Sequence, residues 1–352
     1  VKHNISEGSS PNLKVLELAV EEKATGEIMA GMGIGTDGTN LTFAVSENNW
    51  LGKGLSVNTV ATISAESVTG SFSIRDPNYK YTGNAVTSSA SLSSSDRTLN
   101  SGYKSTKSGF SLGTEFEQYE RIYLSPNISW SFEDIEVDAT ASDSVKKMEG
   151  TFANLDLGYG IIVDNRNQSY KPTGGYRASF SQTLPLIMEQ SSIKNGINII
   201  KYHGFSEDVT GVVKVLGRSI HGVDNEDVRL TSRLFLPQNS LRGFNVKRTG
   251  PKDGTDWVGG NYATAVGFEA RMPNLLPEGM RTDISMFFDT ANVWGVDYSD
   301  TVDDGSDIRS SIGIAANIFT VVGPLALTLA QSVTNGKNDE TEVFNFRLGT
   351  SF

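Results

Sequence analysis

The side chains that most often perform covalent chemistry are scarce in this chain. Its 352 residues include no cysteine and three histidines, His3, His203 and His221. None of the histidines stands in a nucleophile-elbow sequence or at a spacing typical of metal ligands. The sequence therefore predicts no catalytic residue, no cofactor-binding residue and no metal ligand. We expect a function that depends on binding and shape rather than on enzymatic chemistry.

One short motif lies in an unusually long connection. The segment 222–258, about 37 residues, separates two predicted strands and contains Leu241-Arg242-Gly243-Phe244. Connections of this length in a compact protein are usually functional or disordered. The guanidinium of Arg242 is a planar fork suited to carboxylates, Gly243 permits a tight turn, and Phe244 offers an apolar anchor. Taken alone, an Arg-Gly pair is more typical of a surface turn.

Composition excludes several classes of protein. A formal net charge of −11, with scattered Lys and Arg, argues against a nucleic-acid partner, which requires a basic stripe. The longest mainly apolar run, residues 320–330, is far shorter than the roughly 18 residues of a spanning helix. The lack of cysteine leaves the redox compartment open. Residues 1–10 show no signal-peptide pattern, so we expect a mature chain or a piece of one.

Period-two alternation dominates the chain and predicts strands with one apolar face. Leu155, Leu157 and Tyr159, for example, alternate with Asp156 and Gly158. Turn signals separate these runs at short intervals, which indicates antiparallel hairpins. Sixteen strands are predicted, at 26–36, 39–47, 54–64, 67–76, 80–92, 108–119, 121–137, 148–163, 174–184, 194–207, 209–221, 259–271, 280–292, 307–319, 323–334 and 341–352.

Alternation alone fits a soluble β-sandwich as well as a transmembrane barrel. Two features favour the barrel. No strand is apolar on both faces, and the faces opposite the apolar ones are rich in Ser, Asn, Asp and Gly, which are poor material for a dry core. The chain also ends on Phe352, in register with the apolar face formed by Phe344, Phe346 and Leu348. The alternation at 12–22 looks like the last strand of a preceding domain.

From Leu241-Arg242-Gly243-Phe244 onward, the chain resembles the BamA family of outer-membrane protein assembly factors. The similarity continues through Phe268-Glu269, Phe287-Phe288-Asp289 and residues 344–352, and it includes Asn49-Trp50-Leu51-Gly52-Lys53-Gly54 near the start. It covers nearly the whole chain and is weakest at 85–150. Two departures stand out: Leu241 replaces the usual valine, and the long loop lacks the cysteine-bearing insertion of some members.

The resemblance implies an all-β fold, a 16-stranded antiparallel transmembrane β-barrel with a long loop folded into the lumen. Residues 1–23 would be the C-terminal remnant of the last periplasmic POTRA domain, and 24–352 the barrel. The resemblance also implies that Arg242 pairs with the acidic residues Glu269 and Asp289 on the inner wall. The expected location is the outer membrane of a Gram-negative bacterium.

The function that the resemblance implies is the folding and insertion of client β-barrel proteins. Partners would be unfolded clients, outer-membrane lipids and, through the missing POTRA domains, lipoproteins of the assembly machinery. We expect a lateral seam between the first strand, weakened by Gly31, Gly33 and Gly35, and the last strand, which carries Phe344, Phe346, Leu348 and Phe352. A client strand would pair with the freed edge by β-augmentation.

Two other functions remain open from the sequence. A TamA-like factor or a two-partner secretion transporter would share the barrel and the Arg-Gly motif, so that motif does not separate them from an insertase. A passive porin would need neither a motif that plugs the lumen nor a seam weakened by glycines.

Overall fold

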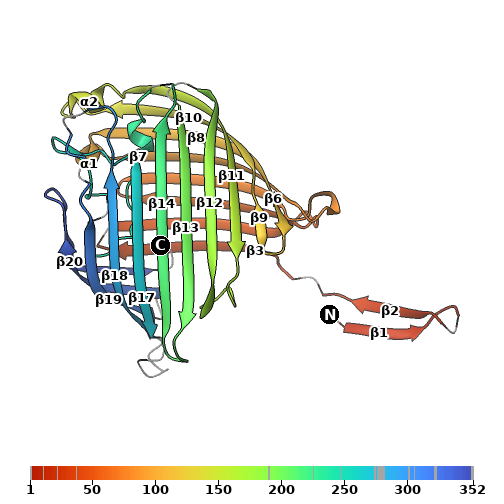
Figure 1. Ribbon diagram of the computed structural model, residues 1–352. Coiled ribbons are helices and arrows are strands. Elements are labelled where there is room, and N and C mark those ends of the chain that lie inside the picture. The colour runs from red at the N-terminus through yellow and green to blue at the C-terminus, as the bar shows by residue number, and fades with distance from the viewer. Residues whose placement is uncertain are drawn as a thin grey trace.

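The computed structural model describes residues 2–349 except 11, 22, 37, 189–190, 225, 246, 273–274, 276–281, 300–301, 305 and 321–322. It consists of a large barrel and a small hairpin that projects from the barrel's N-terminal side (Figure 1). In the hairpin, β1 (Lys2–Glu7) pairs with β2 (Lys14–Ala19) as a separate two-stranded sheet. Its assignment to a POTRA domain stays a prediction.

The barrel strands form one antiparallel sheet in which each strand pairs with its neighbours in sequence. They are β3 Gly26–Gly35, β4 Gly38–Trp50, β5 Leu55–Ser64, β6 Ser67–Asp76, β7 Ala85–Asp96, β8 Tyr103–Tyr119, β9 Ile122–Leu124, β10 Asn127–Val137, β11 Gly150–Asp164, β12 Gly174–Met188, β13 Ser192–Gly204, β14 Thr210–Gly222, β17 Tyr262–Met272, β18 Thr282–Trp294, β19 Arg309–Thr320, β20 Gly323–Thr334 and β21 Phe344–Gly349. Short helices lie in the connections: η1 Tyr79–Tyr81, α1 Thr98–Ser101, α2 Asp143–Lys146 and η2 Leu230–Ser232.

The sheet contains 17 strand segments, but two of them occupy one position, so the barrel has sixteen strands. β9 and β10 both pair with β8 on one side and β11 on the other, so they are two parts of one strand, broken at Ser125 and Pro126. Proline has no amide proton to give to a ladder, which explains the break. Because β21 pairs with β3, the sheet is closed. The predicted sixteen-stranded antiparallel barrel is confirmed.

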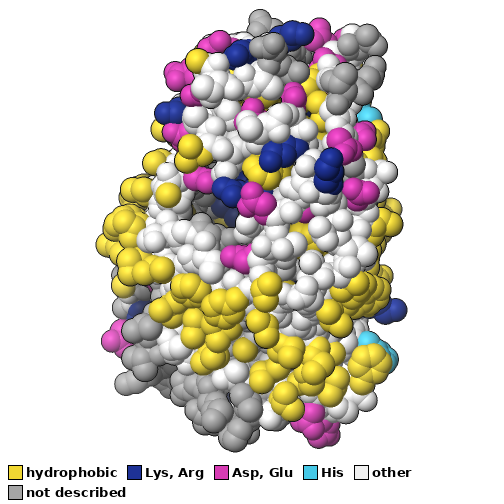
Figure 2. Space-filling view, turned by 90° about the vertical axis from the view of Figure 1, so that its left-hand side faces the viewer, with side chains coloured by type: hydrophobic (Ala, Val, Ile, Leu, Met, Phe, Trp, Pro, Cys, Tyr) yellow, Lys and Arg dark blue, Asp and Glu magenta, His cyan; other side chains and the backbone are white. Residues whose placement is uncertain are grey.

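The two faces of the wall differ as the alternation requires. On β4, for example, Leu41, Phe43 and Val45 are 39%, 52% and 50% exposed, while Thr42 between them is buried. Figure 2 shows hydrophobic side chains gathered in a belt on one face, with most of the charged groups on the part of that face above it. None of the helices in the described part of the chain is long and apolar enough to cross a membrane.

Several strand boundaries differ from those predicted. The strand expected at 80–92 begins at Ala85, because Tyr79–Tyr81 forms a 3-10 turn in which Lys80 and Tyr81 have positive φ. Residues 259–261 belong to the long connection rather than to a strand, and the last strand, expected at 341–352, begins at Phe344. Phe352 lies outside the described residues.

Candidate functional site: the lumen loop and the seam

The long connection between β14 and β17 packs against the inner wall of the barrel. It contains η2 and a two-stranded hairpin of β15 (Lys252–Asp253) and β16 (Asp256–Trp257). Leu241 and Phe244 of the motif are 4% and 5% exposed. They form an apolar cluster with Leu236 and with small wall residues of β17 and β18, namely Ala263, Ala265, Ala291 and Val293. Small side chains on the wall leave room for the loop to lie against it.

Arg242 binds Asp289 of β18 through both ends of its guanidinium. Its Nε donates to Oδ2 at 2.7 Å and its Nη2 donates to Oδ1 at 2.9 Å, while the backbone N–H of Arg242 donates to Oδ2 at 3.2 Å. The side chain of Asp289 is only 2% exposed. The guanidinium carbon lies 3.5 Å from the ring centre of Phe287. A buried carboxylate thus has its charge compensated by one arginine in bidentate geometry.

Glu269 of β17 is the second acidic residue at this point and is shared by three cations. Lys214 of β14 donates to Oε2 and Arg271 donates to Oε1, both at 2.8 Å. Arg242 Nη1 is 3.6 Å from Oε2, at the edge of an ion pair. The main partner of Arg242 is therefore Asp289, and Glu269 is held chiefly by wall residues. Lys214 and Arg271 are not predictable from the sequence as partners of Glu269, because the sequence does not give the register between strands.

Gly243 has a conformation and a position that disfavour any residue with a side chain. Its φ is +89°, a backbone angle that residues with a side chain rarely adopt. A Cβ atom there would lie 2.9 Å from Cβ of Ala330 on β20. The glycine thus allows the loop backbone to pass close to β20 directly after the Arg242 anchor.

A second contact joins the loop to the segment 339–342, which leads into the last strand; we call this contact the clasp. The N–H of Glu342 donates to the carbonyl of Gly243 and the N–H of Asn245 to the carbonyl of Glu340, both at 2.9 Å. The N–H of Glu340 donates to the carbonyl of Arg248 at 3.1 Å. β21 begins only two residues after Glu342, so the loop fixes the start of the last strand.

Side chains strengthen the clasp. Arg248 Nη1 donates to Glu340 Oε2 at 2.8 Å, and Asn245 Nδ2 donates to the same oxygen at 3.0 Å. The hydrogen bond from Arg248 is the main cause that lowers the pKa of the Glu340 carboxyl. Asp339, the first residue of the segment 339–342, forms an ion pair of 2.7 Å with Arg309, and the two side chains are 1% and 2% exposed. No local motif in the sequence marks Asn245, Arg248, Asp339 or Glu340 as members of this contact.

Over the described residues, the seam between β21 and β3 is the shortest interface between two full-length strands of the barrel. It consists of three residue pairs, Arg347 with Gly35, Leu348 with Ile34 and Gly349 with Gly33, whereas β3 and β4 share ten. The N–H of Thr36 adds one bond, to the carbonyl of Phe346 at 3.1 Å. Among the described residues, nothing pairs with 26–32 of β3 on the seam side. Within the described part of the chain, that stretch is therefore a strand edge without a partner on the seam side; residues 350–352, which follow β21, lie outside it.

The three seam glycines lie on the lumen face of β3. They alternate with Met32 and Ile34, which are 52% and 40% exposed on the outer face. At Gly35 a Cβ atom would lie 2.6 Å from the carbonyl oxygen of Phe346, so glycine allows the two strands to approach there. On β21, Phe344 is 51% exposed and its ring stacks on Phe346 at 6.3 Å, while Leu348 pairs with Ile34.

The described residues contain no group of three or more His, Asp or Glu side chains placed to hold a metal ion. The candidate site is thus a set of contacts that position strands: an anchor at Arg242, a clasp at Glu340 and a short seam.

Comparisons with known proteins agree with this architecture. The chain is 26% identical over 349 residues to the outer membrane protein assembly factor BamA of Neorickettsia risticii, covering 96% of this chain and 46% of that protein. It therefore spans about half the length of that relative. Its fold is similar to a crystal structure of BamA from Haemophilus ducreyi lacking POTRA domains 1–3, with a TM-score of 0.87, 22% identity and coverage of 100% of this chain and 75% of the other.

A second solved structure, CdiB from Escherichia coli, is less similar. Its TM-score is 0.63 at 13% identity, over 100% of this chain and 67% of that one. The Omp85 superfamily domain matches residues 49–352, which is most of the chain. The protein is therefore a β-barrel of the Gram-negative outer membrane, and it belongs to the Omp85 superfamily.

Proposed function

We propose that this chain is the barrel of an assembly machine that folds client β-barrel proteins and inserts them into the outer membrane through the seam between β3 and β21. The observation that carries the proposal is that, over the described residues, β21 and β3 share three residue pairs and 26–32 has no partner on the seam side. A strand edge with free N–H and C=O groups is a template for another strand. The name of the BamA relative, an assembly factor, supports the same activity.

The mechanism needs no bond to be made or broken. A client's terminal strand would add to the edge of β3, while β21, held to β3 by few hydrogen bonds, separates from it. Each further client strand would then pair with the previous one, so that few backbone groups are left unpaired in the hydrocarbon. The Arg242 anchor and the clasp would hold β21 at its loop end and so set where the seam opens. Residues 1–23 would connect this barrel to POTRA domains that receive clients and lipoproteins.

A disulfide across the seam tests the proposal. Cysteines replacing Ile34 and Leu348 would face each other in register, and the native chain has no cysteine to interfere. Opposed residues in antiparallel strands lie about 4.5–5.5 Å apart, a spacing that a disulfide spans. We expect the oxidised full-length protein in proteoliposomes to stop inserting an unfolded client, and reduction to restore insertion. The matched control replaces Leu41 and Ile63, which face each other on β4 and β5.

Full insertion by the oxidised seam variant would refute the gate. The alternative function is that of a protein-translocating barrel of the TamA-like or two-partner secretion kind. The similarity of the fold to CdiB is compatible with it. The same vesicles separate the two, because a translocator moves an extended polypeptide into the lumen of the vesicle without leaving a folded barrel in the bilayer. A passive porin fits less well, because the loop anchored at Arg242 occupies part of the lumen.

A further inference from the structure

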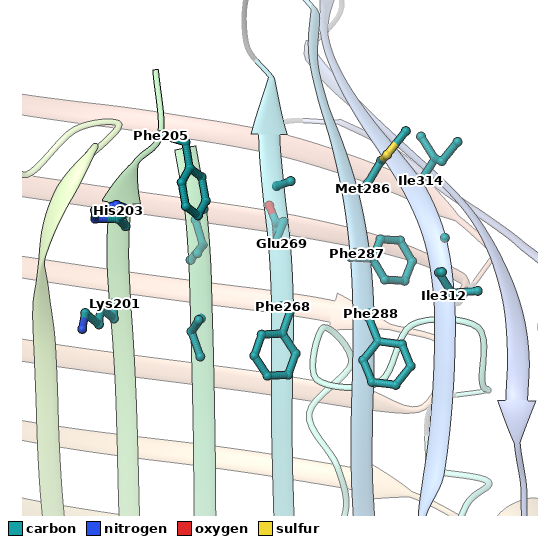
Figure 3. A pocket seen from close by; sticks show the side chains of 15 residues that line it. Lys201, His203, Phe205, Phe268, Glu269, Met286, Phe287, Phe288, Ile312 and Ile314 are labelled. Atoms are coloured by element: carbon teal, nitrogen blue, oxygen red, sulfur yellow. The ribbon is translucent and has the colours of Figure 1, made fainter. Parts of the chain in front are cut away.

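The outer wall of the barrel carries an apolar groove that neither the loop nor the seam uses. It has a volume of about 730 Å³ and extends over β13, β14, β17, β18 and β19. Among its lining residues, Phe268, Met286 and Ile312 are 48%, 54% and 54% exposed, so they point away from the lumen toward lipid. We call it the outer groove, and Figure 3 shows its side chains.

Two small residues form the floor of the outer groove. Gly211 on β14 faces Ala270 on β17, and Ala270 in turn faces Met286 on β18. The ring of Phe205 leans over Gly211, since a Cβ atom there would lie 2.5 Å from its Cε2. Phe268, two residues before Ala270 on the same face of β17, lies beside this floor. A trough one side chain deep, between aromatic and aliphatic walls, has the shape to hold one hydrocarbon chain in van der Waals contact.

The groove runs obliquely to the plane of the membrane. It follows one line of facing residues across five strands: His203, Gly211, Ala270, Met286 and Ile314. His203 is one residue from the end of β13 at Gly204, whereas Ile314 is six residues from the end of β19 at Thr320. Both strands end on the side of the short turns, which in outer-membrane barrels is the periplasmic side. The groove therefore rises from the periplasmic boundary into the hydrocarbon.

The mouth of the groove carries charges of both signs. Lys201 and His203 are exposed on the outer face of β13, and Tyr176 of β12 faces Lys201. The following turn, 205–209, contributes Glu207 and Asp208, which are also exposed. The next lysine along the chain, Lys214, points into the lumen and is bound by Glu269. A cation beside two carboxylates complements a headgroup that contains both a phosphate and an ammonium group.

We propose that the outer groove binds one glycerophospholipid of the periplasmic leaflet, with an acyl chain over Gly211 and Ala270, its phosphate at Lys201 and a primary ammonium group at the acidic turn. The affinity comes from packing and from the headgroup, because an acyl chain gains little hydrophobic free energy on moving from lipid to a lipid-facing groove. The site is separate from the seam, so the lipid-binding proposal does not depend on the proposed insertase activity.

Photolabelling of the full-length protein in phosphatidylcholine nanodiscs tests the site. The probe is phosphatidylethanolamine with a diazirine in its acyl chain, and mass spectrometry locates the cross-links. We expect labels concentrated on Val213, Phe268 and Met286. Ala270→Phe, or Ala270→Leu if the first variant folds poorly, fills the floor and should lower this labelling roughly fivefold, the scale of a lost interaction of about 1 kcal/mol. Ala90→Phe is the control, since Ala90 is exposed on β7 between Phe72 and Phe110.

The headgroup is tested separately. Lys201→Gln should lower labelling by a similar factor, whereas Lys201→Arg should retain it. A diacylglycerol probe with the same chain, and a phosphatidylglycerol probe that lacks the ammonium group, should both label more weakly than phosphatidylethanolamine. Labels spread evenly over the apolar outer wall, labelling that is unchanged by both Ala270 variants, or equal labelling by diacylglycerol or phosphatidylglycerol would each overturn the proposal.

Discussion

Replacing Arg242 with alanine is expected to release the long loop from the inner wall. The variant removes both guanidinium hydrogen bonds to Asp289, whose side chain is 2% exposed. Among the described residues, the backbone N–H at 3.2 Å then remains as the hydrogen-bond donor to that carboxylate. Removing one partner of a buried ion pair typically costs about 3–5 kcal/mol. Loss of the contact with the Phe287 ring, at 3.5 Å, adds about 1 kcal/mol. Even 3 kcal/mol changes the ratio of seated to released loop by roughly 150-fold.

Amide hydrogen exchange of the full-length protein measures this ratio directly. The N–H groups of Asn245 and Gly250 are bonded to Glu340 and Asp339 only while the loop is seated, so their protection should fall by about two orders of magnitude. Arg242→Lys should fall between wild type and alanine, because an ammonium group cannot bind both carboxylate oxygens in a planar fork.

Two comparisons make the test specific. Arg75→Ala breaks a pair with Glu115 in which both side chains are about 40% exposed, so it should leave the loop amides unchanged. A double-mutant cycle of Arg242→Ala with Asp289→Asn should give a coupling free energy of about 2 kcal/mol or more. Effects that add within about 0.5 kcal/mol, or unchanged exchange at Asn245 in Arg242→Ala, would refute the anchor.

The remaining predictions concern the same loop. Gly243→Ala should weaken loop seating by about 1–2 kcal/mol in the same exchange experiment, because φ is +89° and the new methyl group would meet Ala330 at 2.9 Å. Gly70→Ala, where no atom lies within 4 Å, should have no such effect, and equal behaviour of the two variants would contradict the steric argument. Because Arg248 lowers the pKa of Glu340, the clasp should be fully stabilised above the unfolded-state pKa of about 4.3 and weaken as pH falls through the lower folded-state value. Arg248→Gln should make loop exchange, corrected for its intrinsic pH dependence, nearly independent of pH below 5; an unaltered profile would argue against the pair.

Alternation is sufficient to predict the barrel's strands. Each strand has one face toward lipid and one toward the aqueous lumen, so apolar and polar residues must alternate along it. The break between β9 and β10 is not predictable from the alternation, since Pro126 interrupts the hydrogen bonding between strands without interrupting the alternation. The strand at 80–92 was placed too early, because the 3-10 turn at Tyr79–Tyr81 depends on positive φ values that the side chains do not signal.

The candidate site divides along the same line. The motif 241–244 stands out in the sequence because its chemistry is local: one fork of donors, one glycine and one aromatic ring. The acidic partners came from the family resemblance, and Lys214 and Arg271 beside Glu269 were not foreseen. Cross-strand neighbours depend on register, and a shift of two residues preserves the alternation while changing every partner.

Alternation along the amino-acid sequence predicts the strands, the arginine motif is visible in the longest loop, and the family resemblance implies that the strands form an outer-membrane barrel. Partners across strands become known only from the fold: Arg242 is held chiefly by Asp289, the loop binds Glu340 ahead of the last strand, and β21 pairs with β3 at three of the described residues. The physical reason is that alternation is a property of neighbouring residues. Pairing between residues about 50 to 310 positions apart is fixed only when the sheet closes into a barrel, which sets the register of each strand against its neighbours.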